Sequence, residues 1–281
     1  MKIGNLVAAG QAIAAGLPGC ESIDDLLERH AEDKNYESAA KLGIAECILA
    51  AERGSPLRQN PSNIRLPTID GYSQHWASRL LQTVAKGCAK GGKNLAETFT
   101  RLKVINFNYD RCFEWFTFLW LRNVYNLNEY EALEILKLLD VVHPYGSLGP
   151  IPGTSREGIP FGYEPNEHEL FEISQNILTY SESLEKDHRP GLISKLTQDS
   201  DRFIFLGFAF HPQNMNLMNM GTGISGSQVY ATTVGMPPPR WENAQYRIAR
   251  TLSQSKKSIS ILSSEVSCEE LIRHYGDRWA D

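Results

Sequence analysis

The spacing of apolar residues changes along this chain, and each change predicts a different kind of element. Up to about residue 95, apolar positions recur every three or four residues, which is the period of amphipathic helices. Ser22 precedes the first of these helices and is suited to cap it, with Asp24 and Asp25 in a first turn that favours acidic side chains. The predicted helices of this part cover residues 23–53 in two pieces, 72–88 and 94–101.

Farther along, short apolar runs alternate with helical patterns. The runs predict strands at 104–107, 141–143, 203–207, 229–234 and 258–262. The helical patterns cover 111–125, 129–139, 166–185, 191–199, 243–253 and 268–279. Such alternation is typical of an α/β fold, a mostly parallel, doubly wound sheet with helices on both faces. Residues 144–165 are rich in Gly and Pro and predict a long loop, which is often functional in a compact domain.

Composition narrows the class of protein. The net charge of −5 and the pI near 5.9 argue against a general nucleic-acid binder. The chain has no run approaching the ~20 apolar residues of a membrane span, and its opening segment lacks the pattern of a secretory signal. The five cysteines are scattered and never spaced C-x-x-C, which indicates reduced thiols in a cytoplasmic protein. The histidines show no ligand spacing, so no metal site is predicted.

Polar residues follow directly after several predicted strands. Asn108, Tyr109 and Asp110 end the first strand, just before a helix begins. The other strand ends carry the polar clusters 143–149, 207–214 and 232–235. Because the carboxyl ends of parallel strands lie on one edge of a sheet, we expect these clusters to share an edge and to form a crevice for a nucleotide.

Three motifs occur in a fixed order: Asn-Tyr-Asp at 108–110, Tyr-Gly-Ser at 145–147 and Gly-Phe-x-Phe at 207–210. This order resembles the sirtuin-like domains of bacterial antiphage defence proteins, over about residues 100–265. The resemblance implies a Rossmann-like fold that binds NAD and hydrolyses it to nicotinamide and ADP-ribose. It also implies one domain over 1–281, with a mainly helical part at 1–95, the Rossmann-like core at 100–265 and a C-terminal helix at 266–281.

The resemblance also implies roles for residues. Asn108 and Asp110 match the family's Asn and Asp beside the nicotinamide ribose. The family's base is a His directly before Gly-Ser, where this chain has Tyr145, a poor base at neutral pH. His143 lies two residues earlier, on the same face of the strand, and its ordinary pKa near 6.5 suits base work. The implied cofactor-binding residues are Asn106, Tyr145, Gly146, Ser147, Gly207, Phe208, Phe210, His211, Thr232 and Thr233.

One part of the family pattern is missing. Family members open with a strand and a Gly-Ala-Gly-Ala-Ser loop that holds the pyrophosphate through backbone N–H groups. The corresponding segments of this chain, residues 7–12 and 15–18, contain only Gly10 of the glycine pair. Their pattern predicts an ordinary helix and turn. We therefore expect this chain to lack the first βα unit and, with it, most of the contacts that would bind the pyrophosphate.

Two other classes of function stay open. A non-enzymatic module would keep the fold and bind NAD or ADP-ribose, or dock a partner protein. A protein-lysine deacetylase is disfavoured because the paired C-x-x-C elements of its zinc ribbon are absent. The resemblance further implies a homo-oligomer or a defence-system partner that triggers the activity.

Structural roles compete at individual residues as well. Asp110 and His211 could cap helices, and His143 could bond only to backbone. Gly146 and Gly207 could be turn glycines. Cys112 as a nucleophile is disfavoured against a buried helix cysteine.

Overall fold

The computed structural model describes residues 3–59, 66–86, 88, 93–185, 189–198, 200–218, 228–252 and 260–279. The chain divides into two compact units. Unit 1 comprises Met1–Thr68, Asn106–Leu119 and His143–Lys186, and unit 2 comprises Ile69–Ile105, Trp120–Val142 and Asp187–Asp281. The domain boundaries implied by the resemblance stay predictions.

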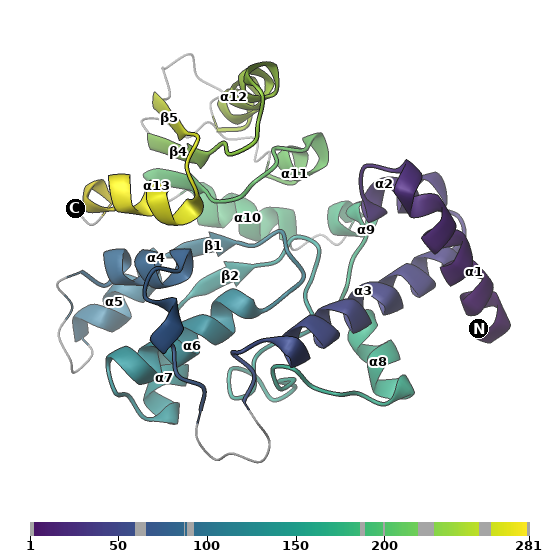
Figure 1. Cartoon of the computed structure of the whole chain (residues 1–281), viewed down its shortest axis with the longest axis horizontal. Coiled ribbons are helices and arrows are strands. Elements are labelled where there is room, and N and C mark those ends of the chain that lie inside the picture. The colour runs from purple at the N-terminus through teal and green to yellow at the C-terminus, as the bar shows by residue number, and fades with distance from the viewer. Residues whose placement is uncertain are drawn as a thin grey trace. The chain divides into compact units, whose positions relative to one another are not determined.

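Unit 1 is helical. Its elements are α1 (Ile3–Gly16), a 3-10 turn (Leu17–Gly19), α2 (Ile23–Arg29), α3 (Lys34–Gly54), α8 (Glu167–Ser174), α9 (Tyr180–Glu185) and the first part of α6 (Cys112–Val124). Both α1 and α8 pack against α3 (Figure 1). The Ser22 hydroxyl accepts a hydrogen bond from the Asp25 N–H at 3.1 Å, so the predicted cap of α2 is confirmed. Near the far end of α3, Ala45 and Leu49 form a buried cluster with Leu148 and Ile177.

The helix predicted over 166–185 is wrong as a single element. It is divided into α8 and α9 by residues that pair with the long loop. Gly146 forms an antiparallel bridge with Ile177, and the Leu178 N–H donates to the Tyr145 carbonyl at 2.9 Å. These backbone bonds to a distant segment replace the bonds that a continuous helix would make there. The loop itself, residues 144–165, contains no helix or ladder strand, as predicted.

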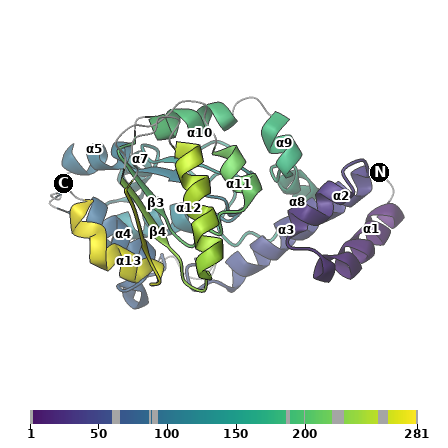
Figure 2. The same cartoon turned by 90° about the horizontal axis from the view of Figure 1, so that it is seen from above.

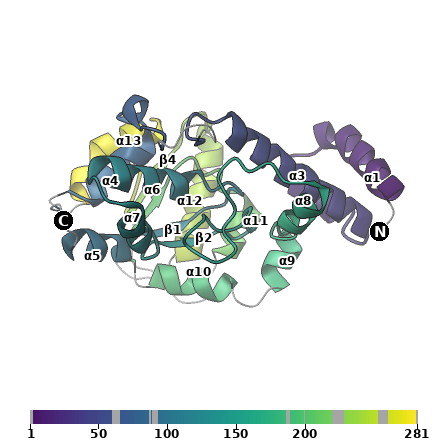
Figure 3. The same cartoon turned by 90° about the horizontal axis from the view of Figure 1, so that it is seen from below.

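Unit 2 contains two small parallel sheets. In the first, β1 (Lys103–Ile105) pairs with β2 (Asp140–Val142), with Val104 opposite Val141. Helix α10 (Arg189–Gln198) lies alongside β2 (Figure 3). In the second, β4 (Gln228–Thr232) lies between β3 (Arg202–Phe205) and β5 (Ser260–Ser264).

Helices flank the second sheet on both sides. Helix α12 (Pro238–Leu252) and helix α13 (Cys268–Tyr275) lie on opposite sides of β4 (Figures 1 and 2). On the α13 side, the Tyr230 ring lies 5.3 Å from the rings of Tyr275 and Trp279. The remaining elements of this unit are α4 (Trp76–Val84), α5 (Lys93–Arg101), α7 (Glu129–Leu136), α11 (Pro212–Leu217), the end of α6 and two 3-10 turns, Asp70–Tyr72 and Gly276–Arg278.

The α/β class and the parallel pairing are confirmed, but the single sheet is not. Within the described residues, β1 and β2 pair only with each other, and β3, β4 and β5 pair only among themselves. The strands β1 and β2 are each three residues long. The expectation that all strand-end clusters share one sheet edge is therefore wrong for these residues.

Among the described helices, none is by itself long and apolar enough to cross a membrane. One pair, Ile3–Gly19 with Ile23–Arg29, meets that criterion together but is bent by 116°.

Candidate functional site

The turn after β1 is organised by its own side chains. The Asn106 carboxamide oxygen accepts from the Asn108 N–H at 3.0 Å, and its amino group donates to the Asp110 carbonyl at 3.5 Å. This Asx arrangement competes with the strand ladder and so ends β1. It leaves the Asn108 residue exposed. Asn106 therefore shapes the turn, and its predicted contact with a nucleotide stays a prediction.

His143, which follows β2, lies against this turn, as the sequence predicted. Its Nδ1 is 2.8 Å from the Asn108 carbonyl oxygen, and its Nε2 is 2.8 Å from Oε1 of Glu114 in α6. Burial by itself lowers the pKa of His143, but the hydrogen bond and charge of Glu114 outweigh it, with help from the Asn108 carbonyl and Asp110, so the pKa is raised. His143 is thus held between two oxygen acceptors. To act as a general base, it would have to break its contact with Glu114.

Asp110 caps the next helix. Its Oδ1 accepts from the Cys112 N–H at 2.9 Å, which is the structural role weighed above. Burial, and then the negative charge and hydrogen bond of Asp110, raise the pKa of the Cys112 thiol well above its usual range. Since the thiolate is the nucleophile, Cys112 is unsuited to nucleophilic catalysis at neutral pH.

A buried ion pair lies next to this cap. Arg111 and Glu52 have side chains that are each only 1% exposed, and they are joined by bonds of 3.2 Å and 2.7 Å. The same Arg111 guanidinium donates to the carbonyl of Ile159 at 2.6 Å, and Glu52 accepts from the Gly162 N–H at 2.9 Å. The pair therefore joins α3, the start of α6 and the long loop within unit 1.

The Tyr-Gly-Ser motif belongs to the interior of unit 1. The Tyr145 side chain is buried, with its ring 6.2 Å from that of Tyr109. Gly146 has a φ of +76°, and a Cβ there would overlap the Asn176 carbonyl oxygen. The Ser147 hydroxyl accepts from the Gly149 N–H at 3.3 Å. The close backbone approach that Gly146 permits is thus made by Asn176.

A carboxyl group from α2 lies beside these tyrosines. Burial raises the pKa of Asp24, and a hydrogen bond from the Tyr109 hydroxyl offsets only part of the shift. Its Oδ1 is buried with no hydrogen-bond partner among the described residues. Burial also raises the pKa values of Tyr109 and Tyr145, so both phenols keep their protons at neutral pH.

The predicted residues of unit 2 form a second group. Gly207 follows β3 with a φ of +61°, and its N–H donates to the Thr232 hydroxyl oxygen at 2.9 Å. That hydroxyl in turn donates to the Phe205 carbonyl at 3.4 Å. Burial raises the pKa of the Cys268 thiol, although its hydrogen bond to Thr232 lowers it somewhat. Gly207 and Thr232 therefore do come together at the ends of β3 and β4.

The rest of this group is packed or exposed in different ways. The Phe210 side chain is 1% exposed, its φ is +55°, and its carbonyl accepts from Arg247 at 2.7 Å. The Phe208 ring packs edge-on against it at 5.1 Å. His211 stands at the N-cap of α11 without a side-chain capping bond, and Thr233 is buried. Their roles as nucleotide contacts stay predictions.

Three residues important to the geometry were not predicted from the sequence: Glu52, Arg111 and Glu114. Glu114 lies one helical turn after Asp110, which is a signal of proximity. However, an acidic residue in the first turn of a helix is ordinary, so its partner could not be read from the pattern. Glu52 and Arg111 are 59 residues apart, and no local signal joins them.

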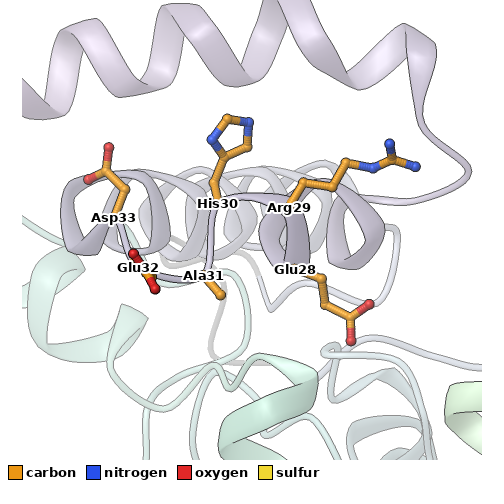
Figure 4. Close-up of a pocket in the computed structure, with 6 residues that line it drawn as sticks. All are labelled: Glu28, Arg29, His30, Ala31, Glu32 and Asp33. Atoms are coloured by element: carbon orange, nitrogen blue, oxygen red, sulfur yellow. The ribbon is translucent and has the colours of Figure 1, made fainter.

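A hollow of about 470 Å³ lies at the turn between α2 and α3 (Figure 4). It is lined by Glu28–Asp33, a single run of consecutive residues. Figure 4 shows Arg29 and His30 pointing to one side of the turn and Glu28 and Glu32 to the other. These side chains do not converge, so the hollow lacks the arrangement of a binding site. The described residues also contain no group of three or more His, Cys, Asp or Glu side chains placed to hold a metal ion.

In comparisons with protein-family models, curated proteins and solved structures, nothing matches this chain. The resemblance to sirtuin-like domains therefore rests on the sequence motifs alone.

Proposed function

We propose that this chain binds NAD⁺ and hydrolyses its N-glycosidic bond, giving nicotinamide and ADP-ribose. The observation that carries the proposal is the meeting of Asn108, Asp110 and His143 at one turn, although His143 is 35 residues from Asn108 in sequence. A polar turn between a strand and a helix is a usual place for ligand chemistry in α/β proteins. The finer parts of the proposal rest on the sequence. A sirtuin-type Rossmann-like fold and a role in antiphage defence with an oligomeric or partner-triggered state come from the resemblance, and a cytoplasmic location comes from the scattered cysteines.

In the proposed reaction, the bond between ribose C1′ and the nicotinamide nitrogen breaks, and its electron pair leaves with neutral nicotinamide. The ribose is left as an oxocarbenium ion, which water attacks with release of one proton. The Asp110 carboxylate stabilises the growing positive charge, and the exposed Asn108 amide orients the nicotinamide or the water. His143, held by Glu114, carries a proton and supports the turn.

The first test is incubation of the purified chain with NAD⁺ and measurement of nicotinamide and ADP-ribose. We expect release by the parent chain and a loss of about 100-fold or more in Asn108→Ala, as for other groups acting at a transition state. Asn5→Ala, on the exposed face of α1, is the matched control and should keep parental activity. Absence of nicotinamide release by the parent, or full activity in Asn108→Ala with the fold intact by circular dichroism, would refute the proposal.

A second candidate is a module that binds NAD⁺ or ADP-ribose without hydrolysis. It is favoured by one observation: Asn106, Asp110 and His143 all have structural bonds already, in a turn, a cap and an ion pair. Such a module would show a rise in Tm that depends on NAD⁺ concentration, without nicotinamide release. Turnover distinguishes the two candidates.

A further inference from the structure

The protonation of His143 follows from its two neighbours. Nδ1 faces the main-chain carbonyl of Asn108, which has no hydrogen to donate, so Nδ1 must carry one. Nε2 lies 2.8 Å from the Glu114 carboxylate, which in its ionised form can only accept a hydrogen bond. A ring that donates from both nitrogens is an imidazolium. His143 and Glu114 therefore form a charged pair, with a cation bonded on its other side to the turn.

Burial makes this pair more than a surface contact. The side chains of His143 and Glu114 are 10% and 15% exposed, so water screens their attraction only weakly. The second carboxylate oxygen of Glu114, Oε2, is buried and has no hydrogen-bond partner within the described part of the chain. The other charged group that acts on His143 is Asp110, from the turn. Glu114 thus holds His143 chiefly through one directed bond.

We propose that Glu114 is a positioning residue, which holds the His143 imidazolium against the Asn108 carbonyl and so fixes the main chain from which the Asn108 side chain projects. For its catalytic meaning this inference rests on the function proposed above. Asn108 is exposed and lies in a turn whose other bond, from its N–H to Asn106, is local. The bond from His143 ties this residue to a distant part of unit 1.

The first experiment is independent of NAD⁺. In protein carrying ¹⁵N-histidine, the His143 imidazole is titrated by NMR in the parent chain and in Glu114→Gln. We expect His143 of the parent to titrate above the ordinary range of histidine and His143 of the variant to titrate lower than in the parent, because the carboxylate charge is gone. The Asn108 amide resonance should shift with this titration. Equal titration of His143 in both proteins, or an Asn108 amide that is insensitive to it, would overturn the proposal.

The second experiment measures NAD⁺ hydrolysis. Glu114→Gln should lower kcat by about 10- to 100-fold with little change in KM, because a misplaced group costs rate while Glu114 itself does not bind substrate. Glu114→Asp keeps the charge and should restore part of kcat. Glu134→Gln removes a carboxylate that pairs with Lys137 at the surface and should behave as the parent.

These outcomes separate the two proposals. If the parent chain hydrolyses no NAD⁺, the proposed function fails, while the NMR titration still tests the role of Glu114. If the parent is active and Glu114→Gln keeps full kcat, the positioning role fails and the proposed function stands. A double variant with His143→Asn should lose no more kcat than the worse single variant, since the two residues act through each other.

Discussion

At the scale of single residues, two neighbouring aspartates of α2 respond to their surroundings in opposite ways. Burial raises the pKa of Asp24, whose Oδ1 has no hydrogen-bond partner among the described residues. A bidentate contact with Arg29 lowers the pKa of Asp25. Ionisation of Asp24 therefore opposes folding, whereas ionisation of Asp25, the next residue, supports it.

The first prediction concerns Asp24→Asn. Because the folded-state pKa of Asp24 is raised, ionisation costs stability as the pH rises from the unfolded value of ~3.9 through the folded pKa. The variant lacks this cost, so its unfolding free energy relative to the parent should be higher at pH 7 than at pH 3. Urea unfolding at both values measures the difference.

Asp25→Asn is the matched control, with the opposite sign. The folded-state pKa of Asp25 is lowered, so its contribution is present above ~3.9 and is lost as the pH falls through the folded pKa. The variant should therefore be less stable than the parent at pH 7 and nearly equal to it at low pH. A pH-independent difference for both variants would show that the two carboxyls do not titrate as described.

At the scale of elements, the helices beginning at Glu129 and Cys268 start where the sequence predicted, whereas α12 begins at Pro238 and not at the predicted residue 243. Asn128, Asn166 and Ser267 each accept a hydrogen bond from the residue three positions on, whose Glu side chain bonds back in a capping box. These signals are contained in four consecutive residues, so they can be recognised without the fold.

Helix ends and strand pairing were predicted less well, because distant residues decide them. Helix α8 ends at Ser174, where the chain turns to pair with Gly146. The strands were found within a few residues, but their pairing into two sheets was not. Which strands lie at the edges of each sheet depends on contacts between residues far apart in the sequence, and a local pattern does not predict these contacts. For the same reason, the nearness of His143 to Asn108 could be predicted from strand ends, whereas its bond to Glu114 could not.

The second prediction concerns Gly146→Ala. The residue has a positive φ, and a Cβ would overlap the Asn176 carbonyl, so the variant must lose the bridge that separates α8 from α9. We expect a loss of about 2 kcal/mol or more in unfolding free energy, from strain and the broken pairing. Thermal and urea unfolding measure it.

Gly43→Ala provides the contrast for that experiment. Gly43 lies on the exposed face of α3, and a Cβ there meets nothing within 4 Å. Alanine should stabilise this helix by about 0.5–1 kcal/mol. Equal effects of the two substitutions would contradict the packing described at Gly146.

At the scale of the whole molecule, unit 1 is assembled from three separate stretches of chain, and its buried charges join them. The third prediction is that Glu52→Gln destabilises the protein by about 3–5 kcal/mol, because it leaves Arg111 buried without its counter-charge. Equilibrium unfolding in urea measures the loss. Glu97→Gln, which removes an exposed pair with Arg101, should cost about 0.5 kcal/mol or less. Similar losses in the two variants would mean that the buried pair contributes no more than a surface one.

The same network also has a consequence for how the protein is made. Glu52 contacts Arg111 and Gly162, which follow it by 59 and 110 positions, and Lys41 pairs with Glu182, 141 positions later. At a synthesis rate of about 5–20 residues per second, the time between the addition of Glu52 and the addition of Gly162 is on the order of ten seconds. During that time α3 has charged residues facing the side that will later be buried. We therefore expect nascent chains that end before residue 162 to be cut by protease within α3, and chains that extend past residue 186 and have emerged from the ribosome to be protected there.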